Sequence, residues 1–259
     1  MKKLILNKVG KVFIGEDERQ VDALHDVDMT ADAGEFLCII GPTGCGKTTL
    51  LRLIAGLMPY SSGSILLDEK PVEGLNPDCT LVFQQLSLFP WFSVLGNVAF
   101  ALEMKGLEKN ERRNKAIELL NLVGLDGVAK AKPYELSGGM QQRVAIARAL
   151  AYDPEILLMD EPFGALDEKT RQRLQNVVLD LWREKQKTIL FVTHNIDEAI
   201  YLADRILVME ADPGRIIGNI PLSLNRPRNR LSQKFIDLHI EIRNLLEISE
   251  NSCAKETVL

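Results

Sequence analysis

The sequence predicts an α/β fold, in which a mostly parallel sheet is preceded by an antiparallel β layer and interrupted by a helical subdomain. Three observations lead to this prediction. Residues 3–30 alternate apolar and polar positions in short runs, which is typical of antiparallel strands. Later, continuous apolar runs alternate with amphipathic stretches, as in a parallel sheet covered by helices. Between them, about residues 86–154 carry helical spacing.

Composition limits the classes of function. The chain has 259 residues, enough for one large domain or for a core with a subdomain. Its net charge of −5 argues against a nucleic-acid partner, which usually requires a basic face. The four cysteines form no C-x-x-C pair, which disfavours a zinc site and favours a reducing, cytoplasmic setting. No apolar run approaches the ~18 residues of a membrane helix, so work at a membrane would require a partner.

A glycine-rich motif, G-x-x-x-x-G-K-T, occupies residues 41–48. It follows a predicted strand at 35–40 and precedes a helical run at 50–55, which is the context of a phosphate-binding loop. Its glycines, Gly41, Gly44 and Gly46, allow positive φ, so that backbone N–H groups can turn toward an anion at the helix terminus. Lys47 is expected to bind the β and γ phosphates, and the Thr48 hydroxyl to ligate Mg²⁺. The predicted contacts are Gly41, Pro42, Thr43, Gly44, Cys45, Gly46, Lys47, Thr48 and Thr49.

After this helix the pattern predicts a loop at 61–64 and short strands at 65–67 and 80–83. The helical subdomain then opens with an aromatic cluster, Phe89, Trp91 and Phe92, around Pro90. Two interpretations are open. The cluster either forms part of a buried subdomain core or presents a docking surface, where aromatic residues are enriched.

Two further apolar strands end in polar residues. Residues 156–159 lead into Asp160 and Glu161, and residues 188–193 lead into His194. Open parallel sheets bind ligands at the carboxyl ends of their strands. A strand-end turn and an ordinary core histidine are the structural alternatives, but a phosphate loop in the same chain favours functional roles. An amphipathic helix at 167–184 separates the two strands, and another strand follows at 205–209.

A second anion site is predicted at residues 136–143, Leu-Ser-Gly-Gly-Met-Gln-Gln-Arg, before a helical run. Ser137, Gly138 and Gly139 offer a hydroxyl and bare N–H groups at a helix N-terminus. Near the end of the chain, a helix is expected to pack on the core, with contact to a second copy or a partner as the alternative. Its apolar stripe is Leu231, Phe235, Leu238, Ile242, Leu245 and Leu246.

With these motifs, the sequence from about residue 3 to 250 resembles the nucleotide-binding subunit of ATP-binding cassette (ABC) transporters. The family's motifs occur in order. They are the phosphate loop, the Gln loop at Gln84, the signature at 136–140, the acidic motif at 156–161, the D-loop at 165–167 and the switch histidine His194. Met140 departs from the commonest signature, which has Gln there. Phe13 matches the aromatic position that stacks on adenine.

The resemblance implies a P-loop NTPase core that carries ATP and a helical subdomain that carries the signature. The implied boundaries are an ATPase domain at 3–225, with the subdomain at about 86–154, and a helical extension and tail at 226–259. It also implies that two copies pair head to tail. Each ATP then lies between the Lys47 loop of one copy and the Ser137 loop of the other.

The resemblance also implies a division of roles in ATP hydrolysis. Glu161 is the implied general base, assisted by His194 and Gln84. Thr48 and Gln84 would hold Mg²⁺, with Asp160 acting through water. Asp167 would order the seam between the two copies.

Several stretches resemble the nitrate/sulfonate/taurine importer group, including residues 88–91, 97–98, 212–215 and 221–228. This implies uptake of a small solute through integral-membrane permease subunits, served indirectly by a periplasmic or lipoprotein solute-binding protein. The chain would lie on the cytoplasmic face of the membrane. One alternative is a free-standing ABC ATPase, although DNA-repair types need a longer insertion than the interval from 84 to 137. The other is a silent cassette acting as an interaction module, which would be expected to lack Lys47, Glu161 or His194.

Overall fold

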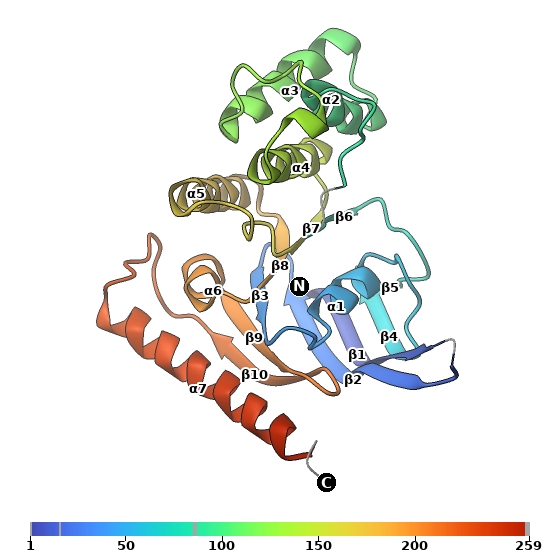
Figure 1. Ribbon diagram of the computed structural model, residues 1–259, viewed down its shortest axis with the longest axis vertical. Helices are drawn as coiled ribbons and strands as arrows, with labels where there is room; N and C mark the ends of the chain where they lie inside the picture. Colours follow the sequence, from blue (N-terminus) through green and yellow to red (C-terminus); the bar gives the residue numbers. More distant parts are fainter. Residues whose placement is uncertain (1, 16, 85–86, 257–259) are drawn as a thin grey trace. The chain divides into compact units, whose positions relative to one another are not determined.

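The computed structural model describes residues 2–15, 17–84 and 87–256 (Figure 1). The chain forms two compact units, Met1–Asn76 with Thr188–Leu259 and Pro77–Lys187. The boundaries 3–225, 86–154 and 226–259 stay predictions, and residues 86 and 257–259 lie outside the described residues.

The first unit begins with an antiparallel sheet in the order β2-β1-β4-β5, which confirms the predicted β layer. Its strands are β1 (Lys2–Ile14), β2 (Gln20–Asp32), β4 (Ser62–Leu67) and β5 (Lys70–Pro71). The loop predicted at 61–64 is wrong, because β4 already starts at Ser62. Gly63, at φ 82°, packs where a Cβ would lie 2.2 Å from the Lys8 carbonyl oxygen. This close approach lets the irregular segment pair with β1.

A set of mostly parallel strands follows in the same unit. Strand β3 pairs in parallel with β8 and with β9, while β10 pairs with β9 in the antiparallel sense. These strands are β3 (Phe36–Ile40), β8 (Thr188–Thr193), β9 (Arg205–Glu210) and β10 (Arg215–Pro221), accompanied by α1 (Lys47–Ile54) and α6 (Ile196–Leu202). Every residue of β3 and β8 is buried, which explains why the sequence shows continuous apolar runs there.

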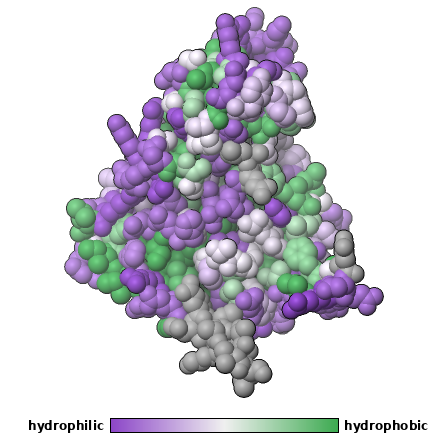
Figure 2. Space-filling model, in the orientation of Figure 1, coloured by the Kyte–Doolittle hydropathy of each residue, from purple (hydrophilic) through white to green (hydrophobic). Residues whose placement is uncertain are grey.

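Helix α7 (Gln233–Glu256) packs on α6 and β9 within this unit, as predicted. Phe235 and Ile242 are its buried contacts. Leu231 corrects the predicted stripe, since it precedes the helix and is 86% exposed. Figure 2 shows hydrophobic side chains at the left edge, over the start of this segment. Ile236 and Ile240 of α7 are exposed hydrophobic residues.

The approach to α7 is fastened by an arginine. Arg228 is buried, and its guanidinium donates to the carbonyl oxygens of Ile200 and Ala203 at the end of α6. Burial lowers the pKa of Arg228 to about 10. Cations at a helix C-terminus complete the last carbonyl groups and oppose the negative end of the dipole. Arg228, the last residue of the stretch 221–228, therefore has a structural role here.

The second unit combines two parallel strands with helices. Strand β6 (Cys79–Val82) pairs with β7 (Ile156–Asp160). The helices are α2 (Val94–Met104), α3 (Lys109–Leu122), α4 (Gly138–Tyr152) and α5 (Glu168–Lys185), with a 3₁₀ turn η1 at Pro133–Glu135. Helices α2 to α4 fall between β6 and β7 in the chain, so the predicted α/β fold with a helical insertion is confirmed. Within the described ranges, no helix is both long enough and apolar enough to span a bilayer.

Candidate functional site

The predicted phosphate loop connects β3 to α1 in the first unit. Gly44 and Gly46 have φ of 88° and 89°, in the left-handed region that glycine tolerates best. Gly41 does not, so its expected positive φ is wrong. Glycine is needed there for space, because a Cβ would lie 2.6 Å from the Met209 carbonyl oxygen. Gly46 directly precedes the first residue of α1, where helix N–H groups lack intrahelical partners.

Lys47 is held against its own loop. Its side chain is buried, and Nζ donates to the carbonyl oxygens of Gly41 and Pro42, both at 2.7 Å. Nζ also lies 3.6 Å from Sγ of Cys45. Burial raises the pKa of the Cys45 thiol, although the charge of Lys47 opposes this effect. Because the Cys45 side chain is fully buried, what this residue offers an anion is its backbone.

The remaining loop residues lie around this lysine. Thr43 and Gly44 are exposed, while Thr48 and Thr49 are half-buried in the first turn of α1. Thr48 therefore follows the lysine directly at the helix terminus. This placement suits a hydroxyl ligand beside bound phosphates.

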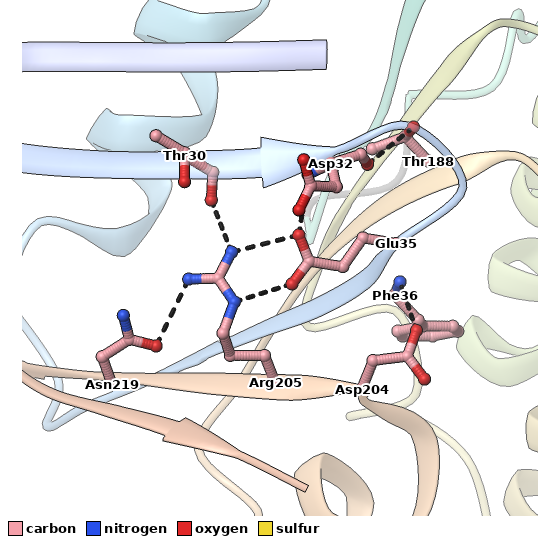
Figure 3. Close-up of polar contacts among 8 residues, drawn as sticks. All are labelled: Thr30, Asp32, Glu35, Phe36, Thr188, Asp204, Arg205 and Asn219. Carbon is pink, nitrogen blue, oxygen red and sulfur yellow. Dashed lines mark hydrogen bonds and ion pairs between the residues drawn. The ribbon is translucent and has the colours of Figure 1, made fainter. Parts of the chain in front are cut away.

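A polar network fixes the turn that leads into β3 (Figure 3). The Arg205 guanidinium donates to both carboxylate oxygens of Glu35, at 2.7 and 3.0 Å, and to the Thr30 carbonyl oxygen at 2.5 Å. Glu35 also accepts from the backbone N–H of Asp32 at 2.8 Å. At the start of β3, the backbone N–H of Phe36 donates to Asp204 at 3.0 Å. Paired, hydrogen-bonded charges of this kind give directional contacts, which suits a strand that positions a ligand loop.

Phe13 lies near the end of β1, opposite Val21 of β2. Its ring is 40% exposed, and Lys11 places Nζ 5.1 Å from the ring centroid. An exposed ring on a strand leaves a face for stacking. The predicted stacking on adenine stays a prediction.

His194 is exposed and follows β8 directly. The turn beneath it is tightly bonded. Thr193 donates its hydroxyl to Glu198 at 2.6 Å and accepts from the Asn195 backbone N–H at 3.0 Å. Asn195 caps α6 by accepting from the Glu198 N–H at 3.1 Å. Sequence reasoning missed these supports, although Asn195 followed by Glu198 has the spacing of a capping box.

In the second unit, the structure joins Gln84 to Glu161. The amide Nε2 of Gln84 donates to the Glu161 carboxylate at 3.3 Å. Glu161 has φ of 45°, an unusual conformation for a residue with a side chain, and such strain tends to accumulate at functional sites. Asp160 is buried at the end of β7. Two carboxylates and an amide therefore meet near one strand end, as parallel strands predict.

The signature residues lie at the N-terminus of α4. Ser137 caps this helix by accepting from the Met140 N–H at 3.3 Å. A Cβ on Gly138 would meet no atom within 4 Å, whereas one on Gly139 would lie 3.1 Å from the Ala165 carbonyl oxygen. Gly138 therefore faces open space at a positive helix end.

Asp167 caps α5 in the same way, by accepting from the Thr170 N–H at 3.0 Å. Hydrogen bonds from Thr170 lower the pKa of this exposed carboxyl. The expected role of Asp167 at a seam between two copies stays a prediction.

The aromatic cluster is neither fully buried nor fully exposed. Phe89 packs against Trp91, Phe92 and Phe100, with ring centroids 5.2–5.7 Å apart. Trp91 is nevertheless 66% exposed. The buried Asn97 holds the Phe89 backbone at both its N–H, at 2.8 Å, and its carbonyl oxygen, at 3.1 Å. A rigid base therefore presents an exposed tryptophan.

Residues 24–164 match the family model described as ABC transporter. This chain belongs to the ABC transporter family. It is an ATPase, in keeping with the motifs that its two units carry. Among its ABC relatives, an uncharacterised ABC transporter ATP-binding protein of Methanocaldococcus jannaschii is 51% identical, over 95% of this chain and 91% of the relative.

Two taurine import ATP-binding proteins are also similar to this ABC chain. The protein of Escherichia coli is 48% identical, over 79% of this chain and 80% of its own length. The protein of Rhizobium johnstonii is 46% identical, over 92% and 94%. Among solved structures, a dimeric ATP-binding cassette in a post-hydrolysis state, bound to ADP and phosphate, superposes with a TM-score of 0.78. It is 36% identical and covers 86% of this chain and all of its own.

Proposed function

We propose that this chain is the ATP-hydrolysing subunit of an ABC importer that takes up a small solute of the nitrate, sulfonate or taurine class. Family membership supports the ATPase, and the two taurine import relatives support the solute class. The observation that carries the proposal is the glycine turn of Gly44 and Gly46, which ends at Lys47 on the first turn of α1. That arrangement offers N–H groups, a helix terminus and a cation to one anion.

ATP is held by its phosphates and by its base. The loop from Gly41 to Thr49 binds the β and γ phosphates, and Lys47 exchanges its carbonyl partners for phosphate oxygens. The exposed ring of Phe13 stacks on adenine. These contacts position the γ-phosphate, which is most of what phosphoryl transfer requires from a protein.

The residues present fit Mg²⁺. The Thr48 hydroxyl, the Gln84 amide oxygen and the Asp160 carboxylate are hard oxygen donors, the kind that this ion prefers. Mg²⁺ bound with ATP supplies neutralisation of the phosphate charge. Asp160 would assist in holding the ion from the buried end of β7.

Glu161 polarises the attacking water as a general base. Its hydrogen bond to Gln84 supports this role, because the bond restrains the carboxylate before water arrives. His194 contacts the γ-phosphate and orients the water. The bonded turn of Thr193, Asn195 and Glu198 limits the movement of that histidine.

A second copy of the chain completes each site. Ser137, Gly138 and Gly139 of one copy contact the γ-phosphate bound by the other, and Asp167 orders the seam. The open space at Gly138 and the dimeric state of the related solved structures support this assembly. Two bound ATP molecules then hold the copies together until hydrolysis releases them.

Integral-membrane permease subunits hold the pair on the cytoplasmic face of the membrane, and a solute-binding protein delivers the solute to them from outside. The exposed Trp91 on its aromatic base is the docking surface for the permease. Because only the permease can couple ATP hydrolysis to movement of the solute, it must bind the ATP-closed dimer and the open dimer of this chain with different affinities.

The test is a tagged pull-down from gently solubilised native membranes. A polytopic membrane protein recovered in near-equal amount is the expected result, and its solute is then tested by uptake assays. A Trp91→Ala chain is the matched control, which should recover less permease while it hydrolyses ATP normally. Recovery from the soluble fraction alone would favour a free-standing ABC ATPase. A purified chain that binds ATP without turnover would favour the silent cassette.

A further inference from the structure

The turn between β9 and β10 touches the phosphate loop directly. A Cβ atom on Gly214 would lie 2.4 Å from the carbonyl oxygen of Cys45 and 2.7 Å from that of Ala23. Both distances are below the 3.0 Å that real Cβ atoms respect. The φ of Gly214 is outside the left-handed region. Glycine is therefore required for space alone, where three backbone segments meet.

The two ends of the phosphate loop are seated in the same way. A Cβ on Gly46 would lie 2.8 Å from the Ala23 carbonyl oxygen and 2.6 Å from Cδ2 of Leu24. A Cβ on Gly41 would lie 2.6 Å from the carbonyl oxygen of Met209, in β9. Leu24 is fully buried. The loop thus rests on β2 and on the end of β9 through backbone carbonyl groups and the buried side chain of Leu24.

This seat is more firmly held than the loop. Leu24 pairs with Lys11 across β1 and β2, and it bridges to Gly214. The His25 N–H donates to the Gly214 carbonyl oxygen at 3.0 Å. By contrast, Cys45 lies in a turn, where its N–H donates to Pro42 at 3.4 Å, a long hydrogen bond. Any atom added at Gly214 will therefore displace Cys45 and its neighbours rather than the strands.

We propose that Gly214 is a positioning residue for ATP. It lets the β9–β10 turn support the phosphate loop at Cys45 while the same turn contacts β2. Phe13 of β1 pairs with Val21 of β2. The same turn therefore contacts the phosphate loop and one of the two strands that hold Phe13 in place. The inference rests on the proposed function, since the position of the loop matters to ATP only if the loop holds its phosphates.

The test compares Gly214→Ala with Gly218→Ala by calorimetric titration with ATP and by steady-state hydrolysis. Gly218 lies in β10, where a Cβ would meet side-chain atoms of Val208 and Leu245 at 3.2–3.4 Å. Gly214→Ala should raise Kd and KM for ATP about tenfold. The added methyl group overpacks the contact, and the loop would have to move away from its ATP-binding position to relieve the strain. At saturating ATP, kcat should change much less. Gly218→Ala should bind ATP like the wild type.

The outcomes separate the two levels of the proposal. A wild-type chain that does not bind ATP would overturn the proposed function itself. If the wild-type chain binds ATP and Gly214→Ala binds it with the same affinity, only the positioning role is overturned. A loss in Gly214→Ala that is confined to kcat would have the same meaning.

If Gly214→Ala fails to fold, hydrogen exchange of the wild-type chain decides. Saturating ATP should slow exchange of the His25 amide, which donates to Gly214. It should leave unchanged the amide of Leu222, which donates to Asp204 at the far end of β10. No protection at His25 would overturn the inference.

Discussion

At the scale of single residues, the most informative contact is the hydrogen bond between Gln84 and Glu161. A carboxylate that accepts a hydrogen bond at 3.3 Å from a neutral amide is oriented without being neutralised. Glu161 also holds an uncommon backbone conformation, with φ of 45°. Both features suit a group that must face one water molecule in one direction.

Replacing Glu161 with Gln should therefore separate binding from turnover. Glu161→Gln keeps the shape of the side chain but removes the proposed base, so kcat should fall by ~10²-fold or more. The Kd for ATP should stay within about threefold of the wild type, because the phosphate loop is untouched. Single-turnover hydrolysis and equilibrium titration measure the two quantities. Near wild-type turnover in the variant would remove Glu161 from the role of base.

Asp153 gives a pH-dependent prediction at the same scale. Burial alone would raise its pKa, but the hydrogen bond from Lys185 and the charges of Lys185, Lys187 and Lys105 together lower it. A lowered folded-state pKa contributes stability above the unfolded value of about 3.9. That contribution is lost as the pH falls through the folded value.

Asp153→Asn should thus destabilise the chain near neutral pH, and the difference from the wild type should shrink as the pH falls below about 4. Chemical denaturation at a series of pH values measures this difference. Asp180→Asn is the control, since Asp180 pairs only loosely with Arg183, at 3.7 Å, on an exposed helix face. A difference for Asp153→Asn that does not vary with pH would contradict the prediction.

At the scale of elements, Asn97 connects α2 to the aromatic segment. Its side chain is buried, and it bonds both backbone groups of Phe89 as well as the Ser93 carbonyl oxygen. The Asn97 amide therefore restrains the turn that carries Trp91, together with the hydrogen bond from Lys132 to the Trp91 carbonyl oxygen. Removing a buried amide of this kind is costly, because the backbone groups that it bonded stay buried and lose a hydrogen-bond partner.

Asn97→Ala should cost about 2–4 kcal/mol in the free energy of unfolding, since three hydrogen bonds are lost and two backbone groups of Phe89 are left without this partner. Denaturation with urea measures the loss. In the pull-down, Asn97→Ala should recover less permease than expected from the reduced amount of folded protein alone. Phe100→Leu, which also trims the base of the cluster but keeps the amide, is the comparison; equal permease loss in both would mean that Asn97 acts only through packing.

At the scale of the whole molecule, the proposed site belongs to two chains. Gly138 is open at the N-terminus of α4, and the related cassettes were solved as dimers. A helix N-terminus attracts a phosphate through its dipole and its free N–H groups. A negative side chain at the same place would compete with that phosphate.

Gly138→Asp should therefore block pairing and spare the single chain. An acidic residue in the first helical turn stabilises a helix by ~0.3–1 kcal/mol, so the fold should be kept. In the Glu161→Gln background, ATP should drive dimer formation, and Gly138→Asp should abolish it while ATP still binds each chain. Sedimentation velocity with and without ATP measures this. ATP-driven dimers that survive the substitution would place the signature outside the interface.

Much of the fold could be predicted because buried parallel strands leave continuous apolar runs, as at Leu37 and Leu190, and because motifs record the chemistry of the phosphate loop. The contacts between distant residues could not. Gln84 and Glu161 are 77 positions apart, and no periodicity connects them. In the sequence, Gly214 looks like any glycine in a turn, and only the folded structure shows that it lies against Cys45. Leu231 fits the apolar spacing of the predicted helix but lies outside it, because the spacing starts before the first helical residue, Gln233.

The anchoring of Lys47 changes how its removal should be understood. The Lys47 ammonium donates to the carbonyl oxygens of Gly41 and Pro42 in its own loop. Under the proposed function, phosphate oxygens would compete with these carbonyl oxygens for one cation. Deleting the lysine would remove its contacts with the loop carbonyl groups as well as its contacts with the phosphates. The affinity lost by such a variant is therefore a lower bound on the attraction between the lysine and the phosphates.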